Sequence, residues 1–313
     1  MDVAEVFAAP KALIRHGWLR TVGADGLPGV QFTDPPGDPG LYGPDSAIWY
    51  VHGDVAGLVG GLAGLLLGGL HQPTIYGTNQ HSSYSDDPLA RLGRTASFVN
   101  AMTWGSMPVV ERTCGIVRTL HRQVRGTMPD GRAYSADDPE QLVWTAVTQA
   151  HCIMLAHQRY HPHPVTGARI DEYYAEYSQF ALRLGAPGPV PSTRDEVTAY
   201  FERMRPQLCC SEETANLADF FRRPFGADPA SKAASLVITR AAFDVLPDWA
   251  RRLYGERASV FTALPRVAEQ QATRRAAQTL LAALRWSLGE PRFQIEARAR
   301  CLAEPTGAAA NDG

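Results

Sequence analysis

Apolar residues recur at helical spacing along most of this chain, and the alternation typical of strands is rare. Gly and Pro residues separate the periodic segments, so the pattern predicts helices of ten to twenty residues joined by loops. Predicted helices begin at Asp54, at the Ser-Asp-Asp-Pro run of residues 85–88, and at Met107-Pro108. Further helices are predicted over residues 138–160, 168–184, 194–206, 211–222, 232–254 and 266–288. This pattern predicts an all-α fold.

The remaining segments are predicted to be irregular, apart from one short strand at Ile48–His52. A polar loop of about fifteen residues is predicted after His71, and another loop over residues 126–138 with a Pro-Asp-Gly turn. We expect one multi-helix domain over residues 51–290. An irregular N-terminal arm, residues 1–50, packs on it after a short first helix, and residues 291–313 form a C-terminal tail.

Two of the predicted helices carry polar residues on faces that should be buried. On the second, one stripe at i, i+4, i+7, i+11 and i+14 consists of Val110, Cys114, Val117, His121 and Val124. On the first, the same spacing relates Arg91, Thr95, Phe98 and Met102. Burying either the imidazole or the guanidinium without a partner costs several kcal/mol. We therefore expect both groups to face a ligand, a polar network or a cavity.

The helix over residues 55–70 is apolar on all sides but contains six glycines. It falls short of the roughly 20 residues that a membrane-spanning helix needs, so we interpret it as a buried core helix without an integral membrane segment. The glycines permit close approach of either a neighbouring element or a flat ligand. Both alternatives stay open at this point.

Composition narrows the classes of function. The formal net charge is -2, and acidic residues are interspersed with the arginines, so no nucleic-acid partner is expected. The five cysteines are an odd number without framework spacing, which favours a reduced cytoplasmic protein. The first twenty residues lack the apolar core of a secretory leader. The sequence does not predict an oligomeric state.

We interpret the cavity between the two helices as a haem b pocket. Haem b needs an axial nitrogen, donors for its propionates and a distal face that controls bound oxygen. His121 supplies the nitrogen, and Arg91 and Thr95, one turn apart, form a polar distal face. Propionate contacts are expected from three arginines on the helix of His121 or just after it, Arg118, Arg122 and Arg125. The alternatives are a satisfied core histidine at His121 and a buried ion pair at Arg91.

A longer pattern resembles a known family. The run GDVAGLVGGLAGLLLGGLHQP…HSSYSDDPLARLGRTASFV…VVERTCGIVRTLHRQVRGTMPDGRAYSADDPEQLVW, between Gly53 and Trp144, is similar to the MpaB/latex-clearing-protein (rubber oxygenase) family. Weaker similarity continues to about Tyr254. Members are largely helical, and the rubber-cleaving ones hold non-covalent haem b in a globin-like core and cleave isoprenoid double bonds with dioxygen.

The resemblance implies roles for particular residues. The family's Arg-x-x-x-Thr pair corresponds to Arg91 and Thr95, and the proximal histidine to His121. Beside the cofactor, where rubber oxygenases have a lysine that can close over the iron, this chain has Arg94, a poor metal ligand because it stays protonated. Ala146 stands where relatives often have a histidine. These departures favour an intracellular small-molecule enzyme over an extracellular polymer degrader.

Other histidines offer further candidates. His71 and His81 flank the loop before the Arg91 helix and are predicted to line the distal side, with His81 as a base or proton relay. The alternative for both is a helix-capping or solvent-exposed histidine. The cluster of His151, His157, His161 and His163 is interpreted as a surface loop beside a helix, because the prolines at 162 and 164 keep it from converging on a metal.

The sequence thus leads to one main hypothesis and two alternatives. The main one is a haem b oxygenase that uses dioxygen or peroxide on a small apolar substrate, such as an isoprenoid, a lipid or a secondary metabolite. The second is a non-catalytic haem or hydrophobic-ligand carrier, because the same pocket would serve it. The third is a helical interaction protein without a cofactor.

Overall fold

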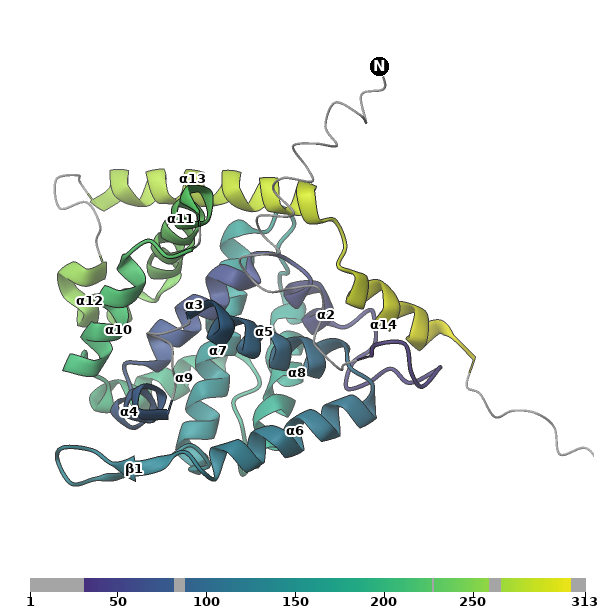
Figure 1. Cartoon of the computed structure of the whole chain (residues 1–313), viewed down its shortest axis with the longest axis horizontal. Coiled ribbons are helices and arrows are strands. Elements are labelled where there is room, and N and C mark those ends of the chain that lie inside the picture. The colour runs from purple at the N-terminus through teal and green to yellow at the C-terminus, as the bar shows by residue number, and fades with distance from the viewer. Residues whose placement is uncertain (1–30, 82–87, 227, 259–265, 305–313) are drawn as a thin grey trace, which may run out of the picture.

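The computed structural model describes residues 31–81, 88–226, 228–258 and 266–304 of the chain. Within these residues the protein consists of α-helices, two short 3₁₀ helices and one two-stranded hairpin (Figure 1). The α-helices are α2 (Ala47–His52), α3 (Gly57–Gly68), α4 (Gln72–His81), α5 (Pro88–Trp104), α6 (Met107–His121), α7 (Pro139–Tyr160), α8 (Ala168–Leu184), α9 (Arg194–Met204), α10 (Glu212–Arg222), α11 (Pro229–Val245), α12 (Asp248–Tyr254), α13 (Arg266–Leu288) and α14 (Arg292–Leu302). The hairpin is β1 (Arg125–Thr127) with β2 (Ala133–Ser135), and the 3₁₀ helices are η1 (Arg205–Gln207) and η2 (Gly255–Ala258). The predicted all-α fold in a single multi-helix domain is confirmed.

Helices α3 and α7 pack against each other along the length of α3 at the centre of the molecule and form its core (Figure 1). They approach so closely that a Cβ added at Gly60 would lie 2.4 Å from the Cα of Ile153. At the other end of α3, the indole Nε1 of Trp144 on α7 donates to the carbonyl of Gly68 at 2.9 Å. Of the two alternatives for the glycines, close packing of helices therefore holds at Gly60. An apolar helix without a polar face is stable when its neighbours cover most of it, and eight of the twelve residues of α3 are buried here.

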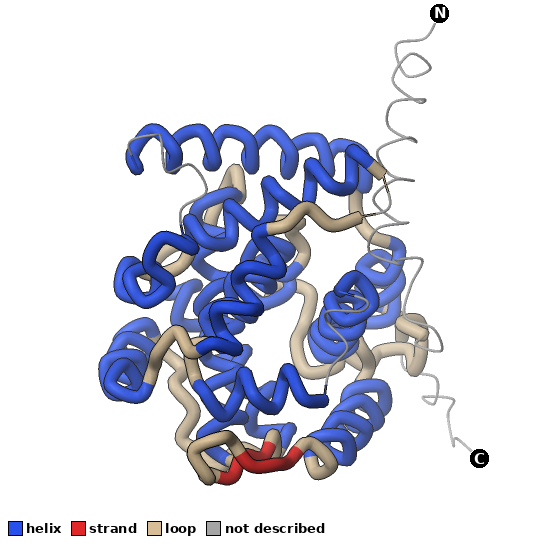
Figure 2. The backbone as a smooth tube through the Cα atoms, turned by 60° about the vertical axis from the view of Figure 1, so that its left-hand side comes forward, coloured by secondary structure: helices blue, strands red, loops and turns tan. Residues whose placement is uncertain are grey.

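The other helices surround this pair. Helix α11 packs on α3 and α13, while α8 packs on α7, α2 and α6. Figure 2 shows the hairpin at the lower edge of the molecule, and the rest of the described chain consists of helices and loops. No helix among the described residues combines the length and the apolar character needed to cross a lipid bilayer.

Local end signals correctly predicted several helices. Asp138 accepts hydrogen bonds from the backbone N–H groups of residues 140 and 141, and α7 starts at Pro139. Asp54 accepts from the N–H of Ala56 at 2.8 Å, just before α3. The predicted starts of α5 and α6 and both ends of α8 and α13 are also confirmed. These boundaries depend on side chains next to the helix in sequence, which explains their predictability.

Other predictions about the elements are wrong. The predicted strand at Ile48–His52 lies in helix α2, because Ser46 caps its first turn and the inward residues are buried on neighbouring helices. The predicted loop after His71 contains α4, whose Pro73 lies in the first turn, where a missing N–H is tolerated. The predicted loop over residues 126–138 contains the β1–β2 hairpin. The predicted helix over 232–254 is two helices, α11 and α12, that break at Leu246-Pro247.

The two ends of the described chain lie against each other. Residues 31–46 are irregular, as expected for the N-terminal arm, while its predicted first helix lies outside the described residues. The segment expected to be a tail contains α14, whose Arg300 is 2% exposed. Its guanidinium donates to the carbonyls of Phe32 (2.9 Å) and Asp38 (2.8 Å). These contacts join residues far apart in sequence, so local pattern did not reveal them.

Candidate functional site

The predicted site lies where α5 and α6 pack together. The two helices meet through Met102 and Cys114, whose sulfur atoms are 3.5 Å apart. Along the predicted stripe of α6, Val110 and Cys114 are buried. The following members, Val117 and His121, are half-buried, as is Val124 beyond the end of the helix. The stripe therefore faces inward throughout but becomes more open towards His121.

His121 is the last residue of α6 and is a half-buried imidazole with an unused polar atom. Its Nδ1 is buried and has no hydrogen-bond partner among the described residues. Burial lowers the pKa of His121 from its ordinary value, and the nearby Asp137 carboxylate opposes part of that shift. The ring is therefore neutral at neutral pH, which is the form that binds a metal ion.

The hairpin and α4 lie next to the end of α6. The N–H of Val124 donates to the carbonyl of His121 at 3.1 Å, and the N–H of Ala136 donates to the carbonyl of Val124 at 2.9 Å. A Cβ added at Gly77 of α4 would lie 3.5 Å from the ring of Tyr134 and 3.6 Å from Val124. These contacts place the hairpin and α4 beside the end of α6, where His121 lies.

The three arginines on or after α6 do not converge on His121. Arg118 donates to the carbonyl of Arg183 at the end of α8 at 2.6 Å. Arg122 is exposed and donates to Thr119 one turn earlier on its own helix at 3.1 Å. Arg125 is exposed, donates to the carbonyl of Arg122 at 2.8 Å and lies 4.0 Å from Asp137. Each of them has at least one partner within the protein.

The predicted distal residues lie in the first half of α5. Arg94 and Thr95 are exposed, so the expectation that Thr95 lies on a buried face is wrong. Phe98 is half-buried and Met102 is fully buried, because α5 packs on the rest of the protein mainly through its last turns. Arg91 belongs to α5, but its side chain lies outside the described residues.

His71 is a buried histidine whose two ring nitrogens both have protein partners. Its Nδ1 lies 2.9 Å from the Thr74 hydroxyl and its Nε2 lies 3.5 Å from Glu140. The ring packs on Trp144, with 5.8 Å between ring centroids. Burial lowers its pKa to about 4, so it is neutral. Of the two alternatives for His71, these contacts favour the structural one, in which it connects the start of α4 to α7.

His81 is exposed at the end of α4 and lies beside the hairpin. Its Nε2 is 3.3 Å from the hydroxyl of Tyr134, which donates its proton to Gln80. The structure thus brings His81 close to the hairpin that follows His121, and it leaves the imidazole accessible to solvent.

A second group of buried histidines lies near α2 and α7. His52 has its Nδ1 2.8 Å from the Thr103 hydroxyl and its Nε2 3.3 Å from the Tyr173 hydroxyl, and burial lowers its pKa to about 3. His157 and His161 stack with 4.4 Å between ring centroids. The surface-loop interpretation is therefore correct for the exposed His163 but wrong for His161, whose side chain is 13% exposed. Periodicity could have indicated that His157 is buried, since it follows the inward face of α7.

No set of three His, Cys, Asp or Glu side chains within the described parts of the chain is arranged to hold a metal ion. The iron of a haem is already bound by the four nitrogens of its ring, so the protein needs to supply only one nitrogen as a ligand. His121 meets that requirement, because it is neutral and has a buried atom without a partner.

The described residues thus form a largely helical domain with a neutral, half-buried histidine at the end of α6. The family model described as ER-bound oxygenase mpaB/B'/Rubber oxygenase, catalytic domain, matches residues 49–294. The match spans most of the 313 residues, so the chain belongs to this family. No curated protein and no solved structure matches the chain.

Proposed function

We propose that this protein is a haem b-dependent oxygenase that acts on a small apolar molecule, an isoprenoid, a lipid or a secondary metabolite, with dioxygen or peroxide. The observation that carries the proposal is His121, a neutral imidazole with a buried, unpartnered Nδ1. Membership of an oxygenase family supplies the class of reaction. The departures from the rubber oxygenases, above all Arg94 in place of lysine, support a small substrate.

His121 is the residue that we assign as the axial ligand. A neutral imidazole offers one lone pair to iron, while the N–H of the other ring nitrogen seeks an acceptor. Bound haem b would supply the redox chemistry that activates the oxidant. Val117, one turn before His121, and Phe98 on α5 are half-buried apolar residues that would exclude water from the reacting molecules.

Arg91 and Thr95 are assigned to the distal side. Their task is to donate hydrogen bonds to the oxidant, and because Thr95 is exposed, the bound cofactor and substrate would have to cover it for such bonds to be strong. Arg94 cannot act as a ligand to iron because its guanidinium stays protonated. His81 is assigned as the group that exchanges protons with solvent, since it is exposed and lies 3.3 Å from the Tyr134 hydroxyl.

Arg118, Arg122 and Arg125 are assigned to the propionates. Arg118 donates from Nη1 to the carbonyl of Arg183 at the end of α8, and its other N–H groups would donate to a carboxylate. Arg122 and Arg125 would have to exchange surface contacts for that role, at a cost of about 1 kcal/mol or less each. His71 is not assigned to the cofactor here, because both of its ring nitrogens have protein partners.

The test is the visible spectrum of the purified protein after addition of haemin. The wild-type protein is expected to show a Soret band at one haem per chain. His121→Ala should remove that band, whereas the exposed control His163→Ala should keep it. A protein that takes up no haemin, or a band that survives in His121→Ala, would refute the assignment. Haem binding without oxygen consumption in the presence of alkene substrates would favour a carrier instead.

Arg91→Ala separates catalysis from cofactor binding. We expect it to lower oxygen consumption while leaving the haem content unchanged. Loss of haem in this variant would place Arg91 at a propionate or in the fold, contrary to the distal assignment.

A further inference from the structure

A pocket of about 380 Å³ lies between α11, α12 and α13. Figure 1 places α13 along one edge of the molecule and α6 along the opposite edge, so this pocket is separate from His121. Its size falls within the range of small-molecule sites, about 300–1,000 Å³. None of the residues discussed above as part of the oxygenase site lines it.

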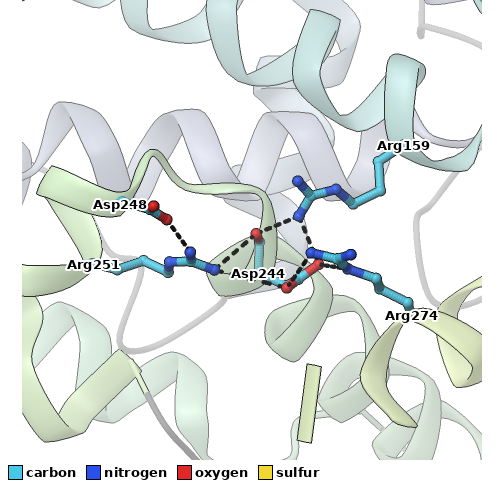
Figure 3. A network of polar contacts seen from close by, with 5 residues as sticks. All are labelled: Arg159, Asp244, Asp248, Arg251 and Arg274. Atoms are coloured by element: carbon cyan, nitrogen blue, oxygen red, sulfur yellow. Dashed lines mark hydrogen bonds and ion pairs between the residues drawn. The ribbon is translucent and has the colours of Figure 1, made fainter. Parts of the chain in front are cut away.

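The pocket is built on a buried carboxylate that contacts three arginines from three helices (Figure 3). The side chain of Asp244, at the end of α11, is 4% exposed. Arg159 of α7 donates to it at 2.7 Å, and Arg274 of α13 at 3.0 Å. Arg251 of α12 lies 3.8 Å from the same carboxylate and also pairs with Asp248. The guanidiniums are thus held in place from different directions around one point.

The charges around this point do not balance. Three arginines and three acidic residues line the pocket: Arg240, Arg251, Arg252, Asp244, Asp248 and Glu269. Arg159 and Arg274 contact Asp244 in addition. The lining alone is balanced, but the cluster that includes the two arginines behind Asp244 has five guanidiniums and three carboxylates, an excess of two positive charges. Like charges held this close repel each other, and an anion in the pocket would relieve that repulsion.

Two of the lining arginines differ in their surroundings. Arg252 is exposed, and no hydrogen bond or ion pair joins its side chain to the described residues. Arg240 is partly desolvated, and burial lowers the pKa of its guanidinium, although Glu269 opposes that shift. It remains protonated, because arginine does so in proteins. Within the described residues, Arg252 thus has its donors available for a ligand, and Arg240 is a partly buried cation.

We propose that the pocket between α11, α12 and α13 binds a small organic phosphate through the guanidiniums of Arg252, Arg240 and Arg251. A phosphate dianion matches the excess of two positive charges, and its three terminal oxygens can accept hydrogen bonds from guanidiniums on different helices. A single carboxylate offers two oxygens in one plane and one charge. The polar side chains of Gln270 and Thr273 also line the pocket and can bind the organic part.

Asp244 is a positioning residue in this proposal. Its buried carboxylate pairs with three arginines and so fixes the directions in which their guanidiniums point. Asp248 has a different effect, because it is exposed and neutralises Arg251 from outside. Removing Asp248 should free Arg251 for the ligand.

The test is isothermal titration of the full chain with pyrophosphate, inorganic phosphate and succinate at constant ionic strength. We expect saturable 1:1 binding of pyrophosphate and weaker binding of phosphate. Arg252→Gln should weaken pyrophosphate binding by roughly tenfold or more, because a charge-assisted hydrogen bond is lost. Arg275→Gln, an exposed arginine on α13 that does not line the pocket, is the matched control and should bind like the wild type.

Asp248→Asn provides a second variant with the opposite sign, since it should tighten binding severalfold. An absence of saturable binding at millimolar pyrophosphate would overturn the proposal. Equal losses of affinity in Arg252→Gln and Arg275→Gln would also overturn it, because they indicate nonspecific attraction. So would succinate that binds as tightly as the phosphates, because the pocket would then be a carboxylate site. All three substituted side chains are exposed, so the thermal melting temperature should stay unchanged, and measuring it detects any loss of folding separately.

Discussion

Two adjacent glycines on α3 should respond in opposite directions to the same substitution. A Cβ added at Gly60 would lie 2.4 Å from the Cα of Ile153 and 3.0 Å from the carbonyl oxygen of Cys152. At Gly61, nothing lies within 4 Å of the added atom. Gly60→Ala therefore forces α3 and α7 apart, whereas Gly61→Ala only changes the helix propensity of the chain.

The magnitudes follow from these distances. Non-bonded carbon atoms prefer about 3.5–4.0 Å, so α7 must move by roughly 1 Å or more in Gly60→Ala. The atoms in the way belong to the backbone, and no change of rotamer can relieve the contact. Overpacking costs about 1–3 kcal/mol, and we expect a net loss of about 2 kcal/mol in the free energy of unfolding. Gly61→Ala should instead add about 0.5–1 kcal/mol.

The assay is urea denaturation followed by far-ultraviolet circular dichroism for the wild type and both variants. The midpoint should fall for Gly60→Ala and rise slightly for Gly61→Ala, with the same slope for all three proteins. Gly64→Ala is a useful intermediate, because the atom it would meet at 2.6 Å is the end of the flexible Gln149 side chain. Midpoints that shift together, or an unchanged midpoint in Gly60→Ala, would show that α3 and α7 do not pack as described.

Two further predictions concern ion pairs and pH. Arg285→Met should lower the free energy of unfolding by roughly 3 kcal/mol, because it leaves the buried Asp54 carboxylate without its arginine. Arg292→Met removes a surface ion pair of the same 2.6 Å length and should lower the free energy of unfolding by about 1 kcal/mol or less. Chemical denaturation of the two variants measures both values, and equal losses would contradict the role of burial. The free energy of unfolding should also fall as the pH drops from about 6.5 towards 4, because histidines bind protons in the unfolded chain while the buried ones stay neutral in the folded protein. Burial lowers the pKa to about 3 in one histidine and to about 4 in three others, namely His52, His71, His151 and His157. Melting temperatures at pH 7, 6 and 5 test this, and a flat profile would count against it.

The candidate site was accessible to sequence reasoning only in part. His121 continues an apolar stripe at helical spacing, and the structure keeps it half-buried at the end of α6. That its Nδ1 has no partner could not be read from the stripe, because this depends on which polar groups other elements bring to the ring. The partners of His71 could not be predicted from the sequence either, since Thr74 lies in α4 and Glu140 in α7.

The sequence by itself determined the class of fold and most helix ends, because period, caps and prolines act within a few residues. It also determined the family, since several separated motifs agree in order. Only the tertiary structure decided that Gly60 meets Ile153, that Arg300 of α14 holds the N-terminal arm, and that arginines from three helices surround Asp244. Apart from the pair of Arg251 and Asp244, these contacts join residues 30 to 268 positions apart, and no local pattern of side chains specifies which distant group completes them.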